Sequence, residues 1–190
     1  MGIHLTPTKL AGVVVIDTDF FRDERGFFIE SYHKQRFAEC GLDYEFVQDN
    51  HSRSIARVLR GLHYQDTSAP MGKLVRCTGG TIHDVAVDIQ VGSPTFGEWV
   101  MVELSADNMR QLMVPPGFAH GFVTASDAAE VQYKCTGFYT PAAEGVLAWN
   151  DPEVGIEWPI TPPILSARDQ RGMSLSDYVR APAFSYQGGR

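Results

Sequence analysis

The stretch from Arg60 to Gln65, RGLHYQ, combines residue types that could bind and transform a charged ligand. Arg60 carries a guanidinium that stays charged, and the imidazole of His63 titrates near neutral pH, so that it can take up or release a proton. Its alternation predicts a strand, which holds a catalytic base more firmly than a loop does. One face would carry Leu59, Gly61, His63 and Gln65, and the other Arg60, Leu62 and Tyr64. The alternative is a structural histidine bonded to a buried carbonyl.

Short apolar or alternating segments, separated by glycine and proline turns, predict the elements around this stretch. The expected strands are 13–18, 27–32, 44–48, 59–65, 73–78, 81–89, 98–104, 111–114, 121–125 and 129–135, with a charged turn at 20–26, a helix at 34–40 and a polar turn at 49–51. Segment 98–104 is apolar on both faces, which predicts a central strand. Because helices do not alternate with these strands, we expect an all-β double-sheet jelly roll whose mouth can bind a ligand.

The segment 129–135 alternates strictly between apolar and polar residues. Tyr133 shares the apolar face with Ala129, Val131 and Cys135, which predicts that its hydroxyl points inward. No linker or repeat divides the chain, and 190 residues suffice for one domain with a sizeable core. We therefore predict a single domain over residues 1–190.

Composition excludes several classes of partner. The net charge is −7 and no lysine–arginine run occurs, which argues against a nucleic-acid surface. No apolar run approaches the length of a membrane span, and no basic N-terminal region precedes an apolar stretch, so we expect no membrane partner. Cys40, Cys77 and Cys135 are far apart and lack metal-type spacing, which predicts reduced thiols and a cytoplasmic location.

The PxGxxH motif that ends at His120 resembles the second motif of the cupins, a jelly-roll superfamily. The first cupin motif supplies two histidines as HxH, and the matching place here is His63-Tyr64-Gln65. Glutamine is a poor replacement for imidazole at a transition-metal site, and although His83 and His120 could join His63, a full ligand set is not evident. We expect no metal; a metal-dependent cupin oxygenase or isomerase is the alternative.

Nine segments in the same order resemble the dTDP-4-dehydrorhamnose 3,5-epimerase family of the cupin superfamily. They are DERGFFIE (23–30), FVQDNHS (46–52), VLRGLHYQ (58–65), GKLVR (72–76), DVAVD (84–88), SPTFG (93–97), PGFAHGF (116–122), WND (149–151) and LSARD (165–169). The resemblance implies a cupin-type double-stranded β-helix with a few short peripheral helices. It also implies the substrate dTDP-4-dehydro-6-deoxy-D-glucose and no cofactor.

In such a substrate the C4 ketone acidifies the protons on C3 and C5, so epimerisation needs a base, a group that stabilises the enolate, and an acid on the opposite face. The resemblance implies His63 as base, Asp169 as its orienting carboxylate, Tyr133 as acid and Lys73 as enolate stabiliser. We expect a cation such as Lys73 to lower the high pKa of Tyr133. From the residues alone, Asp169 could be a surface turn residue, Tyr133 a core tyrosine and Lys73 a solvated lysine.

The resemblance also implies a set of substrate contacts. Arg25 and Arg60 match the family's binding arginines, whose planar guanidinium suits a diphosphate. The other matching positions are Glu30, Gln48, Asp49, Asn50, His120 and Glu144, with Arg168 at a place where many relatives carry lysine. Phe28 and Tyr139 are expected to stack on thymine or sugar, with ordinary aromatic packing as the alternative.

The N-terminal strands, 13–18 and 27–32, are more apolar and aromatic than one sandwich needs. A bare edge strand is an aggregation hazard that a second chain can cover, so we predict a homodimer with residues 1–50 in the interface. The resemblance implies that segment 25–30 completes the partner's pocket; the alternative is that it covers its own barrel. The sequence leaves open whether C3, C5 or both are inverted, and a binding protein without turnover is the alternative to an enzyme.

Overall fold

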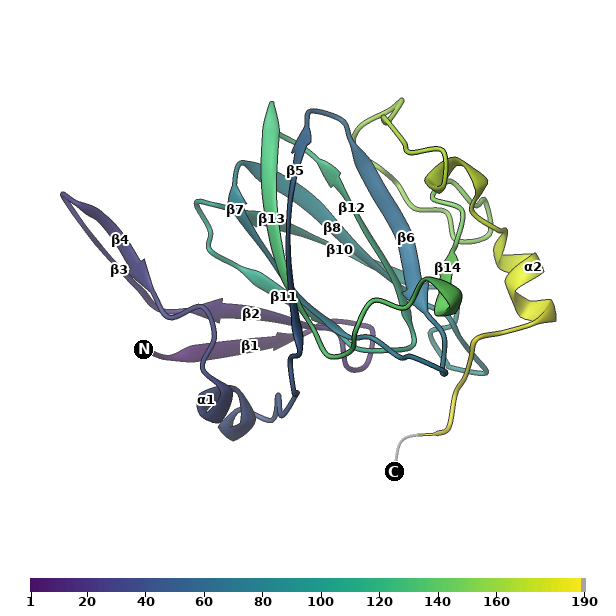
Figure 1. The fold of residues 1–190 in the computed structure, drawn as a ribbon, viewed down its shortest axis with the longest axis horizontal. Coiled ribbons are helices and arrows are strands. Elements are labelled where there is room, and N and C mark those ends of the chain that lie inside the picture. Colours follow the sequence, from purple (N-terminus) through teal and green to yellow (C-terminus); the bar gives the residue numbers. More distant parts are fainter. Residues whose placement is uncertain (189–190) are drawn as a thin grey trace.

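Two antiparallel sheets packed face to face form the body of the protein in the computed structural model, which describes residues 1–188 (Figure 1). The first sheet has the order β1-β2-β11-β7-β13-β5 and the second β10-β8-β12-β6-β14. Their bounds are β1 (Ile3–Pro7), β2 (Val14–Thr18), β5 (Gln48–Ile55), β6 (Leu59–Gln65), β7 (Lys73–Gly79), β8 (Thr81–Asp88), β10 (Trp99–Ser105), β11 (Gln111–Val114), β12 (Phe118–Thr124), β13 (Ala128–Cys135) and β14 (Glu144–Val146). The predicted jelly roll is confirmed; residues 189 and 190 of the predicted domain lie outside the described residues.

The remaining elements are short. They are the hairpin β3 (Phe20–Asp23) and β4 (Gly26–Ile29), the parallel pair β9 (Gln90–Val91) and β15 (Phe184–Ser185), the helices α1 (Lys34–Glu39) and α2 (Leu175–Arg180), and the 3-10 turns η1 (Pro141–Ala143) and η2 (Asp169–Arg171). The predicted helix ends as expected before Gly41, whose φ of +88° suits glycine. Within residues 1–188, no helix has the length and apolar character needed to cross a membrane.

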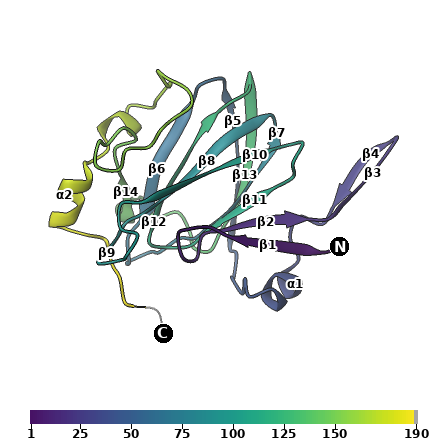
Figure 2. The same ribbon diagram turned by 180° about the vertical axis from the view of Figure 1, so that it is seen from behind.

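Of the three hydrophobic clusters in residues 1–188, two flank the second sheet. One lies between the sheets, where β7, β11 and β13 meet β8, β10 and β12; Val75, Val131 and Ile82 are among its fully buried members. The other lies on the outer face of the second sheet, where Val85 and Val87 pack under the C-terminal segment with Trp158 and Tyr178. Figure 2 shows this segment and α2 on the side of the sheets opposite the hairpin. The second sheet is therefore covered on both faces.

The prediction that segment 98–104 is a central strand was wrong. Strand β10 lies at the edge of the second sheet and pairs only with β8. Both faces are apolar because Val100 and Val102 pack in the core between the sheets, while Trp99 and Met101 pack under the C-terminal segment. Apolar residues on both faces of a strand indicate that both faces are covered. They do not indicate whether the strand lies at the edge or at the centre of its sheet.

Two N-terminal expectations need correction. The charged segment 20–26 is mostly a hairpin, with only Glu24 and Arg25 between β3 and β4, and the strand expected at 27–32 ends at Ile29. In Figure 1 the hairpin projects away from the sheets, and Figure 2 shows the same from behind. Its aromatic side chains face solvent: Phe21, Phe27 and Phe28 are 65%, 54% and 64% exposed.

The strand expected at 44–48 and the polar turn at 49–51 were also wrong. Residues 44–47 are not in a strand, and β5 begins at Gln48 and runs through Asp49, Asn50 and His51 to Ile55. It pairs along its whole length with β13, and Asn50 faces Tyr133. The polar residues fit a strand here because β5 is an edge strand with one face on a cavity and the other on the outside.

Strand β6 does not alternate as predicted, because it contains one more residue than its partner β12 over the same span. His63 pairs with His120 but Arg60 pairs with Phe122, so three steps on β6 oppose two on β12. The backbones approach closely here: a Cβ on Gly61 would lie 2.6 Å from the Cα of Gly121. As a result Arg60 and His63, predicted on opposite faces, both line one cavity.

Candidate active site

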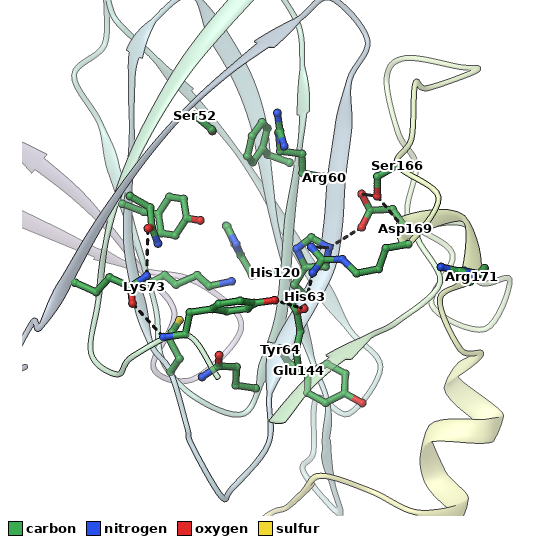
Figure 3. A pocket seen from close by; sticks show the side chains of 18 of the residues that line it. Ser52, Arg60, His63, Tyr64, Lys73, His120, Glu144, Ser166, Asp169 and Arg171 are labelled. Carbon is green, nitrogen blue, oxygen red and sulfur yellow. Dashed lines mark hydrogen bonds and ion pairs between the residues drawn. The ribbon is translucent and has the colours of Figure 1, made fainter. Parts of the chain in front are cut away.

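A cavity of about 780 Å³ opens between the two sheets, a size that suits a small-molecule ligand (Figure 3). Strands β5, β6, β7, β12 and β13 supply its walls, and residues 166–171, which run into η2, close one side. Eleven of the fifteen predicted site residues line it: His63, Tyr133, Asp169, Lys73, Gln48, Asn50, Arg60, His120, Tyr139, Glu144 and Arg168. The fold therefore gathers in one place side chains that the sequence spreads from position 48 to position 169.

A close polar contact joins His63 on β6 to Asp169, the first residue of η2. The Nε2 of His63 lies 2.6 Å from Oδ1 of Asp169, which is 106 positions away in the chain. The hydroxyl of Ser166 donates to the other carboxylate oxygen at 2.8 Å, and the backbone N–H of Asp169 donates to Ser166 Oγ at 3.1 Å. Asp169 is only 3% exposed, so the carboxylate is fixed by these partners rather than by water.

This contact determines which nitrogen of His63 is basic. In the neutral ring the nitrogen facing the carboxylate carries the proton, so Nε2–H donates to Asp169 and the lone pair is left on Nδ1. Burial lowers the pKa of His63 below 6.5, although its bond to Asp169 opposes that shift. Burial raises the pKa of Asp169, but its bonds with His63 and Ser166 outweigh burial and bring it below its usual value. The pair is therefore neutral imidazole and carboxylate near neutral pH.

Lys73 and Tyr133 lie on the first sheet, across the cavity from His63 on β6. Lys73 begins β7, and burial lowers the pKa of its ammonium despite nearby acidic groups. Tyr133 packs against the core between the sheets, as its apolar face predicted. The expectation that a neighbouring cation brings the pKa of Tyr133 below its usual value was wrong: burial raises that pKa, and the lowering effects of the Asn50 bond and of the charge on Arg60 are smaller.

Four further lining residues, Tyr139, Glu144, Arg168 and Arg60, are held by polar contacts. The hydroxyl of Tyr139 donates to Oε2 of Glu144 at 3.0 Å, and Glu144 also forms an ion pair with Arg168. Arg168 in turn approaches His63, with 3.4 Å between Nη2 and Nε2. Between strands β6 and β5, Nε of Arg60 donates to the hydroxyl of Ser54 at 3.0 Å. Tyr139, Glu144 and Arg168 thus form a chain of polar contacts that ends at His63, whereas Arg60 is held separately.

Four predicted site residues do not line this cavity. Arg25 and Phe28 lie on the projecting hairpin, where Arg25 pairs with Asp23 at 2.5 Å. Glu30 pairs with Arg36 of α1 at 2.9 Å. Asp49 bonds Lys134 at 3.0 Å, on the face of β5 opposite the cavity-lining residues Gln48 and Asn50.

Asp84 also belongs to this region, although the sequence did not predict it as a site residue. Its carboxylate is completely buried behind the cavity wall, and Oδ1 lies 2.9 Å from Nε2 of His120. The signal was the placement of Asp84 on one face of the 81–89 alternation, but only the pairing of β8 with β12 brings that face to His120. Within residues 1–188, no group of three or more histidine, cysteine or acidic side chains is arranged to hold a metal ion.

Comparison with known proteins identifies the family. A family model described as dTDP-4-dehydrorhamnose 3,5-epimerase matches residues 7–177. The dTDP-4-dehydrorhamnose 3,5-epimerase of Salmonella typhimurium is 56% identical over 164 residues, which cover 85% of this chain and 90% of that one. The chain belongs to the dTDP-4-dehydrorhamnose 3,5-epimerase family. The resemblance seen in the sequence is thus confirmed.

Solved structures agree with this membership. The epimerase of Legionella pneumophila, determined in complex with dTDP-4-keto-L-rhamnose, is 43% identical and superposes with a TM-score of 0.93, over 98% of this chain and 100% of that one. One relative is named for position 3 alone. It is the dTDP-4-dehydrorhamnose 3-epimerase of Streptomyces niveus, which is 39% identical over 92% of this chain and 85% of its own.

Proposed function

We propose that the protein is a sugar-nucleotide epimerase that inverts C3 and C5 of dTDP-4-dehydro-6-deoxy-D-glucose in deoxysugar biosynthesis. The observation that carries this proposal is the 2.6 Å pair of His63 and Asp169 in the same cavity as Lys73 and Tyr133. The names of the relatives from Salmonella typhimurium and Legionella pneumophila support the substrate class. The Streptomyces niveus relative makes inversion at C3 alone the alternative. The three free cysteines fit the cytoplasmic location that we also propose.

The proposed reaction uses the ketone of the substrate. Nδ1 of His63 takes the proton from the carbon next to C4, and the electron pair of that C–H bond moves into an enolate. The desolvated ammonium of Lys73 stabilises the enolate oxygen, because such an interaction is stronger away from water. Tyr133 then gives its hydroxyl proton to the same carbon from the opposite face. Its raised pKa keeps the hydroxyl protonated until the enolate forms.

Isotope exchange tests this function directly. The protein is incubated in deuterated water with dTDP-4-dehydro-6-deoxy-D-glucose, and proton NMR records the product. We expect deuterium at both C3 and C5, with inversion at both carbons. Deuterium and inversion at C3 alone would establish the narrower activity, whereas binding of dTDP with no exchange would identify a binding protein.

Tyr133→Phe is expected to separate proton removal from proton return. The substitution removes only the hydroxyl, so His63 can still abstract a proton and the enolate can regain one on the original face. We expect inversion to fall by about 10²–10⁴-fold, as for loss of a general acid, while exchange of the substrate proton with solvent falls less. Both rates are measured by NMR in deuterated water. An unchanged inversion rate would remove Tyr133 from the mechanism.

We also propose that a homodimer completes the cavity. The hairpin β3–β4, which projects away from the sheets (Figure 1), leaves three phenylalanines exposed, and its Arg25 does not line the cavity of its own chain. A second copy would cover these side chains, and a symmetric dimer would let each hairpin reach the other chain's site. In this arrangement Arg25, Phe28 and Glu30 bind the nucleotide of the partner, and Asp49 lies towards the interface. Sedimentation at micromolar concentration tests this proposal, and we expect the mass of two chains. A fully active species with the 21.0 kDa mass of one chain would contradict the dimer.

Mixing two inactive variants tests the shared site. We expect Arg25→Ala to lose about 10–100-fold in kcat/KM, the size of a lost charge-assisted phosphate contact. His63→Ala is expected to lack the base. After subunit exchange, half of the dimers contain one chain of each kind and one intact site, so activity should return to about a quarter of wild type. A mixture that stays inactive after confirmed exchange would show that Arg25 serves its own chain.

A further inference from the structure

Residues 138–140, in the segment that leads from β13 to η1, are held by side chains of two glutamines rather than by backbone pairing with a strand. The backbone carbonyl of Phe138 accepts from Nε2 of Gln65 at 3.2 Å. The next two backbone N–H groups donate to glutamine oxygens: Tyr139 to Oε1 of Gln48 at 3.0 Å, and Thr140 to Oε1 of Gln65 at 2.7 Å. Three consecutive residues are thus fixed by β5 and β6, the strands that carry Asn50 and His63.

Gln65 directs both N–H groups and one lone pair of its side-chain amide to loops at the cavity mouth. Besides its bonds to Phe138 and Thr140, its Nε2 donates to the carbonyl of Ala69 at 2.7 Å. The side chain is 6% exposed, so water does not replace these bonds easily, and losing them leaves buried polar groups without partners. This is the position where a metal-binding cupin motif would carry its second histidine. Here its amide ties segments 66–69 and 136–140 to strand β6.

The residue at the centre of this arrangement is Tyr139. Its ring is half exposed at the mouth of the cavity, and its hydroxyl donates to Glu144 at 3.0 Å. A half-exposed ring on a loop would lose conformational entropy when a planar base stacks on it, which weakens binding. Fixing the backbone on both sides of Tyr139 removes most of that cost before the ligand arrives.

We infer that Gln65 is a positioning residue which, together with Gln48, holds Tyr139 in place to receive the nucleotide base. The inference rests on the proposed function, because it assigns Tyr139 to the nucleotide end of a dTDP-sugar. Gln65 also lines the cavity, but its side-chain hydrogen bonds all go to the loops at Ala69, Phe138 and Thr140, so we assign it an action through Tyr139. It therefore affects binding of the nucleotide and leaves proton transfer unchanged.

Two substitutions at Gln65 test this role. Gln65→Glu keeps the shape but replaces the donating amide by a carboxylate oxygen that faces the carbonyls of Phe138 and Ala69. Gln65→Met removes all three bonds without adding charge. We expect each variant to raise the Kd for dTDP by at least about fivefold, the range for leaving one or more buried polar groups unpaired. KM for the dTDP-sugar should rise in parallel, while kcat at saturation stays within about twofold.

A double-mutant cycle separates positioning from general damage or charge. In a Tyr139→Ala chain there is no ring to position, so Gln65→Met should change the Kd for dTDP by less than about twofold. An equal loss in both backgrounds would overturn the inference, because Gln65 would then act on the nucleotide without Tyr139. Gln35→Glu on the surface of α1 is the matched control for Gln65→Glu and should bind dTDP as wild type does.

Amide hydrogen exchange provides a measurement that does not depend on ligand binding. Loss of the Gln65 bonds should speed exchange at the amides of Tyr139 and Thr140 in Gln65→Met, with β7 and β13 unchanged as the check on folding. Unchanged exchange at both amides would overturn the inference that Gln65 positions Tyr139, even if dTDP binding fell. Failure of the wild-type protein to bind dTDP would instead contradict the proposed function.

Discussion

His63→Asn is expected to abolish turnover while leaving dTDP binding close to that of wild type. The substitution removes Nδ1, the atom to which we assign proton abstraction, but leaves the other cavity-lining groups Arg60, Arg168 and Tyr139 in place to bind the nucleotide. Loss of a general base lowers rates by about 10²–10⁴-fold or more. Steady-state kinetics and calorimetric titration with dTDP measure the two quantities separately. A variant that kept even a tenth of the wild-type activity would show that His63 is not the base.

The pH dependence of the wild-type protein provides an independent check on the same residue. His63 acts as a base only when it is neutral, so activity falls as the pH drops through its pKa. Because burial lowers that pKa below 6.5, we expect the acid limb of kcat/KM to lie below pH 6.5. An acid limb above this value would contradict the buried environment seen for His63.

Asp169→Asn should be nearly as damaging as loss of His63, although it removes only one charge. An asparagine can turn its amide N–H towards Nε2, which favours the tautomer with the proton on Nδ1 and blocks the basic atom. We expect kcat to fall by about 10²–10⁴-fold. The acid limb of the residual activity should also move to lower pH, because the carboxylate raises the pKa of His63 and its removal takes that effect away.

Ser166→Ala is the matched control for Asp169. It removes the hydroxyl that donates to Asp169 Oδ2 at 2.8 Å but leaves the carboxylate facing His63. We expect a loss of less than about tenfold, since the charge and the tautomer are retained. If Asp169→Asn were no worse than Ser166→Ala, the carboxylate would not be fixing the tautomer of His63.

The sequence by itself determined the class of fold and the family. Strict alternation in segments 81–89 and 129–135 predicted β8 and β13 to within a residue at each end, because a strand with differing faces needs a period of two. The same alternation placed Tyr133 on the inner face. Nine ordered segments predicted the family that the comparisons confirm.

The sequence was misleading where composition was used to predict whether a segment is a turn, an edge strand or a central strand. Residues 49–51 have the composition of a turn, yet they lie in β5, since an edge strand beside a cavity needs polar side chains. Segment 98–104 has the composition of a central strand, yet β10 is an edge covered on both faces. The composition of a segment reflects whether its side chains are buried or exposed. An edge strand and a central strand can bury their side chains equally, so composition alone does not distinguish them.

Only the tertiary structure decided how the site is assembled. The extra residue in β6 turns Arg60 and His63 into the same cavity, against the period of two that the sequence predicts. The contact between His63 and Asp169 joins positions 106 residues apart, and no local preference encodes such a pairing. Burial, which depends on the packing of both sheets, raises the pKa of Tyr133 where the charge of Lys73 alone predicted the opposite. The sequence determines the types of the reacting groups. The distances between these groups and their protonation states depend on neighbouring residues that only the folded chain brings together.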